Sequence, residues 1–166
     1  MGDHVDRIVA QWRRERPGLD TSANAVMARV LRTARALELA MAEVFERYGL
    51  NRGEFDVLAS LRRAGEPFAL GPSRLAGGLL LSAAAMTNRV DRLEGMGLVR
   101  RRPDPADRRQ VLVELTPRGQ ALTDEAFPAL IAEDERLLAA LPEGDRAALG
   151  SLLRALLTAW EEAGLC

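Results

Sequence analysis

The chain has 166 residues, 48% of them hydrophobic, with 23 basic and 24 acidic side chains, a balance typical of one compact globular domain or of one subunit of an oligomer. No apolar run approaches the roughly 20 residues that span a bilayer, and the charged first twenty residues lack the apolar block of a secretory signal. We therefore expect a cytoplasmic protein with no membrane partner.

The N-terminal part predicts two helices. Apolar residues recur every three or four positions before Pro17, which predicts an amphipathic helix over residues 4–16. A second apolar stripe runs from Val26 to Tyr48, and the glycine after it, Gly49, is typical of a helix end. The second helix is long enough to cross the whole domain.

The middle of the chain predicts a helix-turn-helix. Asn51, with Glu54 three residues later, has the pattern of a capping box at a helix start. The expected elements are then, in order, a helix over 51–64, a very short strand over 68–70, and helices over 72–79 and 83–96. The last of these is capped by Ser82 and separated from its neighbour by a tight turn at 80–82. Two helices joined in this way indicate a helix-turn-helix.

Beyond this motif the hydrophobic period changes from that of a helix to that of a strand. Alternation over 111–115, after a turn-forming stretch at 103–107, predicts a β-hairpin. A hairpin beside a helix-turn-helix is a wing. Pro117 starts a further helix, which we expect to kink at Pro128, and Pro142 starts a last one. The expected fold class is mainly α with a small β-hairpin wing, a winged helix-turn-helix.

The charge is unevenly distributed along the chain. Residues 89–109 hold seven arginines against four acids, a net charge of +3, whereas residues 119–166 hold three arginines against nine acids, a net charge of −6. A basic segment on an acidic body indicates a polyanionic partner, because phosphates neutralised by arginine release their counterions. The alternative is an ordinary solvated run of charges, but the winged pattern around it favours double-stranded DNA.

The second helix of the motif has two distinct faces on a helical wheel. Met86, Val90 and Leu93 share the face that must meet the core, and small or hydrogen-bonding side chains occupy the other. Such residues allow close approach to base edges and phosphates, although a plain solvated surface would look similar. The residues expected to contact DNA are Ser82, Ala84, Thr87, Asn88, Arg92, Arg102, Asp107, Arg108 and Arg109. The last two are expected to reach a neighbouring minor groove.

The segment from Asp107 to Gly119 resembles the D-x-R-x5-L-T-x-x-G signature of MarR-family transcriptional regulators, and every fixed position of the signature is met. Residues 86–99 are similar to the recognition helix of the same family. The resemblance implies a homodimer that reads a palindromic operator and is released by a small molecule. It also implies that Asp107 braces the wing and that Arg109 enters the minor groove.

An additional N-terminal helix bearing Trp12 resembles the urate-responsive subgroup of these regulators. That resemblance places a ligand site at Trp12, Asp56, Arg89 and Arg101, with Arg89 facing inward where Asp56 can pair with it. The subgroup's further polar pocket position falls near Ala64, so a related anionic metabolite or aromatic carboxylate is as plausible as urate. The simpler alternatives are a core role for Trp12, a solvated Asp56 and a phosphate contact for Arg101.

The apolar stripes at the two ends of the chain predict a dimer, since each needs a partner surface, unless they pack within one chain. We expect residues 1–48 and 117–166 to supply the dimerisation helices and residues 49–116 to form the DNA-binding region, all within one compact domain. Two-fold symmetry would then place the two recognition helices about 34–36 Å apart, one turn of DNA.

Other functions have less support. His4 is the single histidine and no nucleophile, phosphate loop or metal-spaced cluster accompanies it, so we expect neither an enzyme nor any cofactor or metal. The lone cysteine, Cys166, excludes an internal disulfide framework and gives little support for a redox switch. The main alternative is a helical protein-interaction module without DNA binding.

Overall fold

The computed structural model describes residues 2–79, 82–107 and 109–165. In chain order its elements are α1 (His4–Glu15), α2 (Ser22–Glu46), α3 (Arg52–Arg63), β1 (Ala69–Leu70), α4 (Pro72–Gly78), α5 (Ala83–Gly95), β2 (Val99–Pro103), β3 (Val111–Leu115), α6 (Pro117–Leu138) and α7 (Glu143–Glu162). These bounds lie close to the predicted ones, and the mainly helical fold with a small β wing is confirmed. The turn predicted at 80–82 includes two residues, 80 and 81, outside the described part of the chain.

Helices α1, α3, α5 and α6 begin where a side chain accepts a hydrogen bond from one of the first free backbone amides. Asn51 and Glu54 form a reciprocal capping box at the start of α3, with bonds of 3.0 and 2.9 Å. The hydroxyl of Thr116 accepts a 3.0 Å bond from the amide of Gly119 at the start of α6. Asn51 and Thr116 therefore act as caps, whereas Thr21 before α2 makes no side-chain cap bond.

The wing is a three-stranded antiparallel sheet in the order β1-β3-β2. The predicted hairpin of β2 and β3 is confirmed, and its register places Arg100 opposite Glu114. The two-residue strand β1 adds to the other edge of β3 and pairs Ala69 with Glu114. Val113 and Leu115 are buried, so one face of β3 joins the core. Glu114, which lies between them in sequence, pairs with Arg100 and Arg102 of β2.

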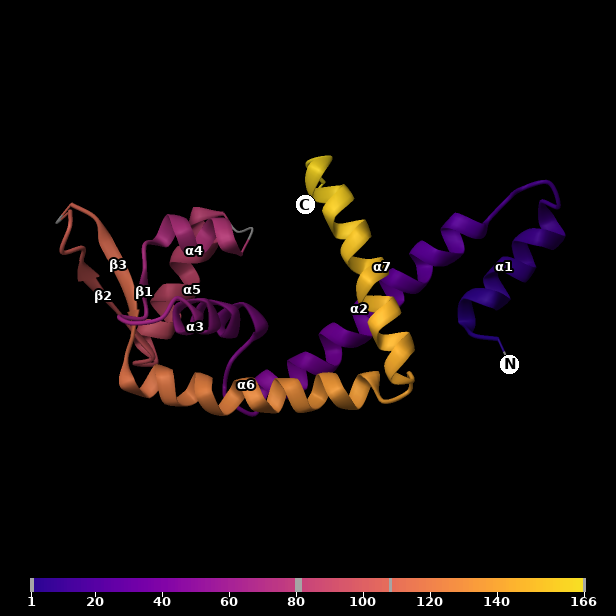
Figure 1. Cartoon of the computed structure of the whole chain (residues 1–166). Coiled ribbons are helices and arrows are strands. Elements are labelled where there is room, and N and C mark those ends of the chain that lie inside the picture. The colour runs from indigo at the N-terminus through magenta and orange to yellow at the C-terminus, as the bar shows by residue number, and fades with distance from the viewer. Residues whose placement is uncertain (1, 80–81, 108, 166) are drawn as a thin grey trace.

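Helix α6 continues through Pro128, where the sequence suggested a kink. A proline inside a helix removes one backbone hydrogen bond and costs about 3 kcal/mol. The neighbours on either side, Ala126 and Leu130, are buried in the core, and this packing holds the helix together at Pro128. The helix extends from the wing to the start of α7 (Figure 1).

The core lies almost entirely in the winged part, where side chains from the end of α2, from α3, α4, α5, the sheet and α6 pack together. By contrast, α7 has no buried residue. The large apolar side chains left exposed on the long outer helices are Trp12, Val26, Met27, Leu31, Leu37, Leu39, Phe127, Ile131, Leu137, Leu138, Leu149, Leu152, Leu153 and Leu157. One chain alone therefore leaves a broad apolar surface uncovered.

The winged part and α1 lie at opposite ends of the molecule (Figure 1). Helix α1 packs against α2, and Arg29 of α2 holds it there by binding both Asp3 and Asp6 at 2.8 and 2.7 Å. Among the described residues no helix combines the length and the apolar content needed to cross a membrane.

Candidate DNA-binding surface

Helix α5 presents the two faces that its sequence predicts. Met86, Val90 and Leu93 are at most 2% exposed, whereas Thr87 and Asn88 lie on the exposed side of the helix. Ala84 and Asp91 are exposed on that side as well, and Ser82 caps the helix through a 3.2 Å bond that its hydroxyl accepts from the amide of Ala85. A polar helix face of this kind, held rigidly by a packed opposite face, is suited to a DNA groove.

The tip of the wing is closed by Asp107. Its carboxylate accepts hydrogen bonds from the backbone amide of Arg109 at 3.0 Å and from the side chain of Gln110 at 3.2 Å. The Arg109 side chain is 96% exposed and approaches Asp107 only to 3.8 Å. The turn is thus fixed while the guanidinium extends into solvent. Arg108, the other predicted tip contact, lies outside the described residues.

Glu114 neutralises two arginines of the wing. Arg100 donates to one of its oxygens at 2.8 Å, and Arg102 forms an ion pair with the other. The hydrogen bond from Arg100 holds the pKa of Glu114 below its ordinary value, although burial acts in the opposite direction. Arg102, a predicted DNA contact, is therefore engaged within the wing and only 25% exposed.

Arg101 connects the wing to the recognition helix. Its guanidinium donates to Glu94 and Asp91 of α5, both at 2.5 Å, and its backbone amide donates to Glu94 at 2.9 Å. Arg101 was expected at a ligand site by family resemblance. In the structure its partners are the two acids of α5, so it acts as a clamp between β2 and that helix.

Arg92 is also engaged within the chain. Its Nε forms an ion pair with Glu54 Oε1 at 2.8 Å, and the Glu54 side chain is 2% exposed while that of Arg92 is 60% exposed. The predicted DNA contact at Arg92 thus has an intramolecular partner on α3. Glu54 itself was identified from the sequence only as a capping residue.

Two of the predicted ligand-site residues come together around Gly53. The Arg89 side chain crosses this glycine so closely that a Cβ there would lie 2.3 Å from the Arg89 Cζ. Asp56 lies on the next turn of α3, and its Oδ2 is 3.7 Å from the Nε of Arg52. Burial raises the pKa of the Asp56 carboxyl, against the opposing attraction of Arg52 and Arg89. Arg52, Asp56 and Arg89 thus form one charged cluster beside Gly53.

Trp12 does not reach this cluster within one chain. Helix α1 lies at the far end of the molecule from α3 and α5 (Figure 1), and Trp12 is 46% exposed, so the core role that the sequence allowed is wrong for the single chain. Ala64, at the subgroup's polar pocket position, is exposed at the end of α3.

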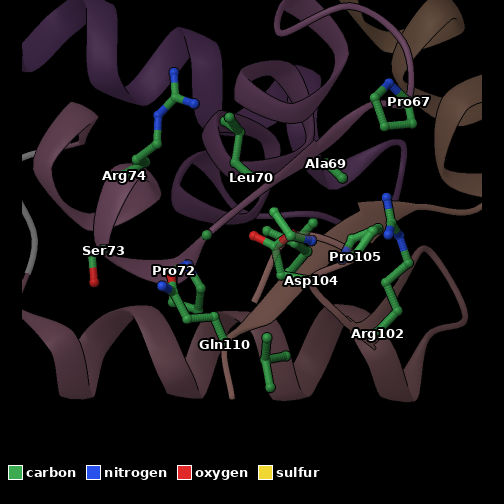
Figure 2. Close-up of a pocket in the computed structure, with 14 residues that line it drawn as sticks. Pro67, Ala69, Leu70, Pro72, Ser73, Arg74, Arg102, Asp104, Pro105 and Gln110 are labelled. Carbon is green, nitrogen blue, oxygen red and sulfur yellow. The ribbon is translucent and has the colours of Figure 1, made fainter. Parts of the chain in front are cut away.

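A groove that the sequence did not predict lies between the wing and the start of α4. It has a volume of about 640 Å³ and is lined from both sides by polar and apolar residues. Figure 2 shows Arg74 and Arg102 on opposite sides of it, with Asp104 and Gln110 between them. The lining includes residues of β1 and β3, which pair with each other. The short strand was predicted over 68–70, but its pairing with β3 was not.

Comparison with known proteins identifies a matching protein family. The model of the MarR family matches residues 50–111, the stretch from the start of α3 to the start of β3. The HTH-type transcriptional regulator PecS of Dickeya dadantii is 38% identical over 149 residues, which cover 90% of each chain.

Solved structures with the same fold include two that bear on function. MarR of E. coli in complex with operator DNA superposes with a TM-score of 0.70 at 26% identity, over 88% of this chain and 97% of the other. BpsR of Bordetella bronchiseptica, described by the regulation of its DNA binding by 6-hydroxynicotinic acid, superposes with a TM-score of 0.72 at 27% identity, over 84% and 97%. The similarity includes the helices outside the winged part.

Proposed function

This chain belongs to the MarR family of transcriptional regulators, and we propose that it is a homodimeric repressor that binds a palindromic operator and is released by a small anionic or aromatic ligand. The observation that carries the proposal is the exposed polar face of α5, fixed by Arg101 to a wing whose Arg109 side chain is 96% exposed. This arrangement presents one element to the major groove and another to the adjacent minor groove.

The distribution of buried and exposed apolar residues indicates which parts of the chain bind DNA and which dimerise. Residues 49–116 contain most of the core and form the part that reads DNA. Residues 1–48 and 117–166 carry most of the uncovered apolar surface and dimerise through it. A two-fold dimer of this kind reads two half-sites about one turn of DNA apart. A protein with this role works where the DNA is, in the cytoplasm.

The proposed DNA contacts lie on the exposed face of α5 and at the tip of the wing. We assign base-edge contacts to Thr87 and Asn88 on α5, where Ser82 and Ala84 allow close approach, and minor-groove contacts to Arg108 and Arg109, braced by Asp107. MarR of E. coli, similar over most of its length, is described in complex with operator DNA. The intramolecular pairs of Arg92 and Arg102 make these two arginines weaker candidates than Arg109.

The ligand proposal rests on the cluster of Asp56 and Arg89. A ligand anion that binds Arg89 competes with Asp56 for it and shifts α5, which carries both Arg89 and the DNA-reading face. Trp12 contributes only if a second subunit brings it there, since α1 is remote within one chain. BpsR, whose DNA binding is described as regulated by 6-hydroxynicotinic acid, supports an aromatic carboxylate as the ligand class at least as well as urate.

The test is binding to the DNA upstream of the protein's own gene across a salt series, with and without urate and a panel of aromatic and polycarboxylic acids. Steeply salt-dependent, sequence-selective binding that one compound abolishes supports the full proposal. Binding that no compound changes retains the DNA function and removes the ligand site. If the protein binds no duplex at any salt concentration, the alternative of a helical protein-interaction module takes its place.

A further inference from the structure

Glu54 is a buried carboxylate with two separate partners. Its Oε2 accepts a 2.9 Å hydrogen bond from the amide of Asn51, where the chain turns from α2 into α3. Its Oε1 forms an ion pair with Arg92 Nε of α5 at 2.8 Å, and the Glu54 side chain is 2% exposed. One side chain thus joins the corner between α2 and α3 to the recognition helix.

The position of Arg92 on α5 lets the Glu54–Arg92 pair set the orientation of that helix. Arg92 is four residues after Asn88, so the two side chains lie on the same side of the helix, one turn apart. Drawing Arg92 toward α3 therefore fixes the rotation of α5 about its own axis, and with it the direction in which Asn88 points. Arg101 holds the opposite flank of the same helix through Asp91.

Breaking the Glu54–Arg92 ion pair costs free energy, whichever partner is removed. A buried carboxylate that loses its cationic partner remains desolvated and unpaired, and Asn51 offers it only one backbone hydrogen bond. If Arg92 moved out to meet a phosphate, Glu54 would be left in this state. Burial of the acid therefore favours keeping Arg92 in its intramolecular role.

We infer that Glu54 is a positioning residue for DNA recognition, which orients α5 through Arg92 and does not itself touch DNA. The inference rests on the proposed DNA-binding function. It differs from the sequence-based expectation in which Arg92 is itself a DNA contact.

The test compares Glu54→Gln, Arg92→Met and the double variant with Glu135→Gln, which removes an exposed carboxylate from α6. The probe is a fluorescent duplex that the wild-type protein has selected from a random-sequence library. We expect each single variant to weaken Kd by on the order of tenfold and the double variant to be no weaker than the worse single one. The slope of log Kd against log salt concentration should stay at the wild-type value, because no phosphate contact is lost. Glu135→Gln should change neither quantity.

The opposite pattern would overturn the inference. If Arg92→Met lowers the salt slope by about one while Glu54→Gln leaves Kd unchanged, Arg92 is a phosphate contact. Unchanged Kd in both variants overturns it as well. Should Glu54→Gln fail to fold, Arg92→Met remains informative, because that side chain is 60% exposed.

Amide hydrogen exchange separates this inference from the proposed function. Glu54→Gln and Arg92→Met should both speed exchange in α5 and leave α6 unchanged, whether or not DNA is present. If the wild-type protein selects no duplex, the proposed function fails. Exchange in α5 then decides the inference alone, and unaltered exchange overturns it.

Discussion

Gly119, in the first turn of α6, lies directly against the carbonyl oxygen of Leu98, so closely that a Cβ on the glycine would be 1.9 Å from that oxygen. The same carbonyl accepts a 3.1 Å hydrogen bond from the amide of Thr116. The start of α6 is thereby seated on the end of the segment that leads from α5 into the wing. This contact gives a physical reason for the last glycine of the D-x-R-x5-L-T-x-x-G signature.

Gly119→Ala should destabilise the protein more than any other glycine-to-alanine change described here. The new methyl group meets backbone, which cannot rotate away, so either α6 or the Leu98 segment has to move; we expect a loss of about 3 kcal/mol or more, the range of severe overpacking. Urea unfolding measures this. Gly144→Ala is the matched control, because nothing lies within 4 Å of its Cβ position. Equal stability of the two variants would contradict the contact.

Arg109→Ala should weaken operator binding by about 1 to 3 kcal/mol, the range of one good arginine contact to DNA. The side chain is 96% exposed, so its loss leaves the fold intact and the thermal midpoint unchanged. Fluorescence anisotropy with a selected duplex measures the effect. Arg136→Ala removes an arginine that is paired with Glu133 on α6, and it should bind like the wild type; equal losses in both variants would show a general charge effect instead.

Glu114→Gln should lower stability in a pH-dependent way. The pKa of Glu114 is held below its ordinary value of 4.5, chiefly by Arg100 and further by Arg102, against the effect of burial. A carboxyl with a lowered pKa in the folded state stabilises the fold above its unfolded pKa, and this contribution is lost as the pH falls through the folded-state pKa.

We therefore expect Glu114→Gln to cost about 1 to 3 kcal/mol at neutral pH and progressively less below pH 4.5. Urea unfolding at several pH values measures the difference from the wild type. Glu135→Gln, at an exposed position on α6, should show no such trend. A cost that persists unchanged at acid pH would mean that the ion pairs with the two arginines do not account for it.

Leu152→Glu should shift the protein from dimer to monomer. Leu152 is 67% exposed in the single chain, on a helix with no buried residue. A charge placed in an apolar interface costs several kcal/mol unless it is paired. Sedimentation equilibrium measures the mass. Ala121→Glu introduces the same charge at an exposed position near the wing end of α6 and should remain dimeric. A dimeric Leu152→Glu variant would place the interface elsewhere.

Gly53→Ala should weaken the response of DNA binding to the ligand without lowering the free energy of unfolding. Alanine favours the helix by about 0.5–1 kcal/mol over glycine, and the clash at 2.3 Å is with the far end of the flexible Arg89 side chain. We expect an unchanged or higher unfolding free energy together with a weaker response of DNA binding to the effector that the compound panel identifies. Gly144→Ala should leave the response intact. An unaltered response in Gly53→Ala would remove Arg89 from the ligand site.

The elements were predictable because caps and apolar stripes are local signals. Asn51 with Glu54, and Thr116 before Pro117, mark helix starts within a few residues of sequence. The faces of α5 were predictable for the same reason.

The partners of the arginines were not predictable, because they depend on how distant elements pack. Nothing near Arg92 in sequence points to Glu54, and the ion pair of Arg102 follows from the register of β2 against β3. The groove beside the wing depends on the pairing of β1 with β3; the short strand was predicted, but nothing near it in sequence indicates its partner strand. Trp12 was assigned by resemblance to a site that lies at the other end of α2.

The clamp formed by Arg101 has a consequence for which operators the protein tolerates. Because its guanidinium holds both Asp91 and Glu94, the recognition helix and the wing approach DNA as one rigid body with a fixed reach. In the proposed palindromic operator, an inserted or deleted base pair inside a half-site should therefore abolish recognition.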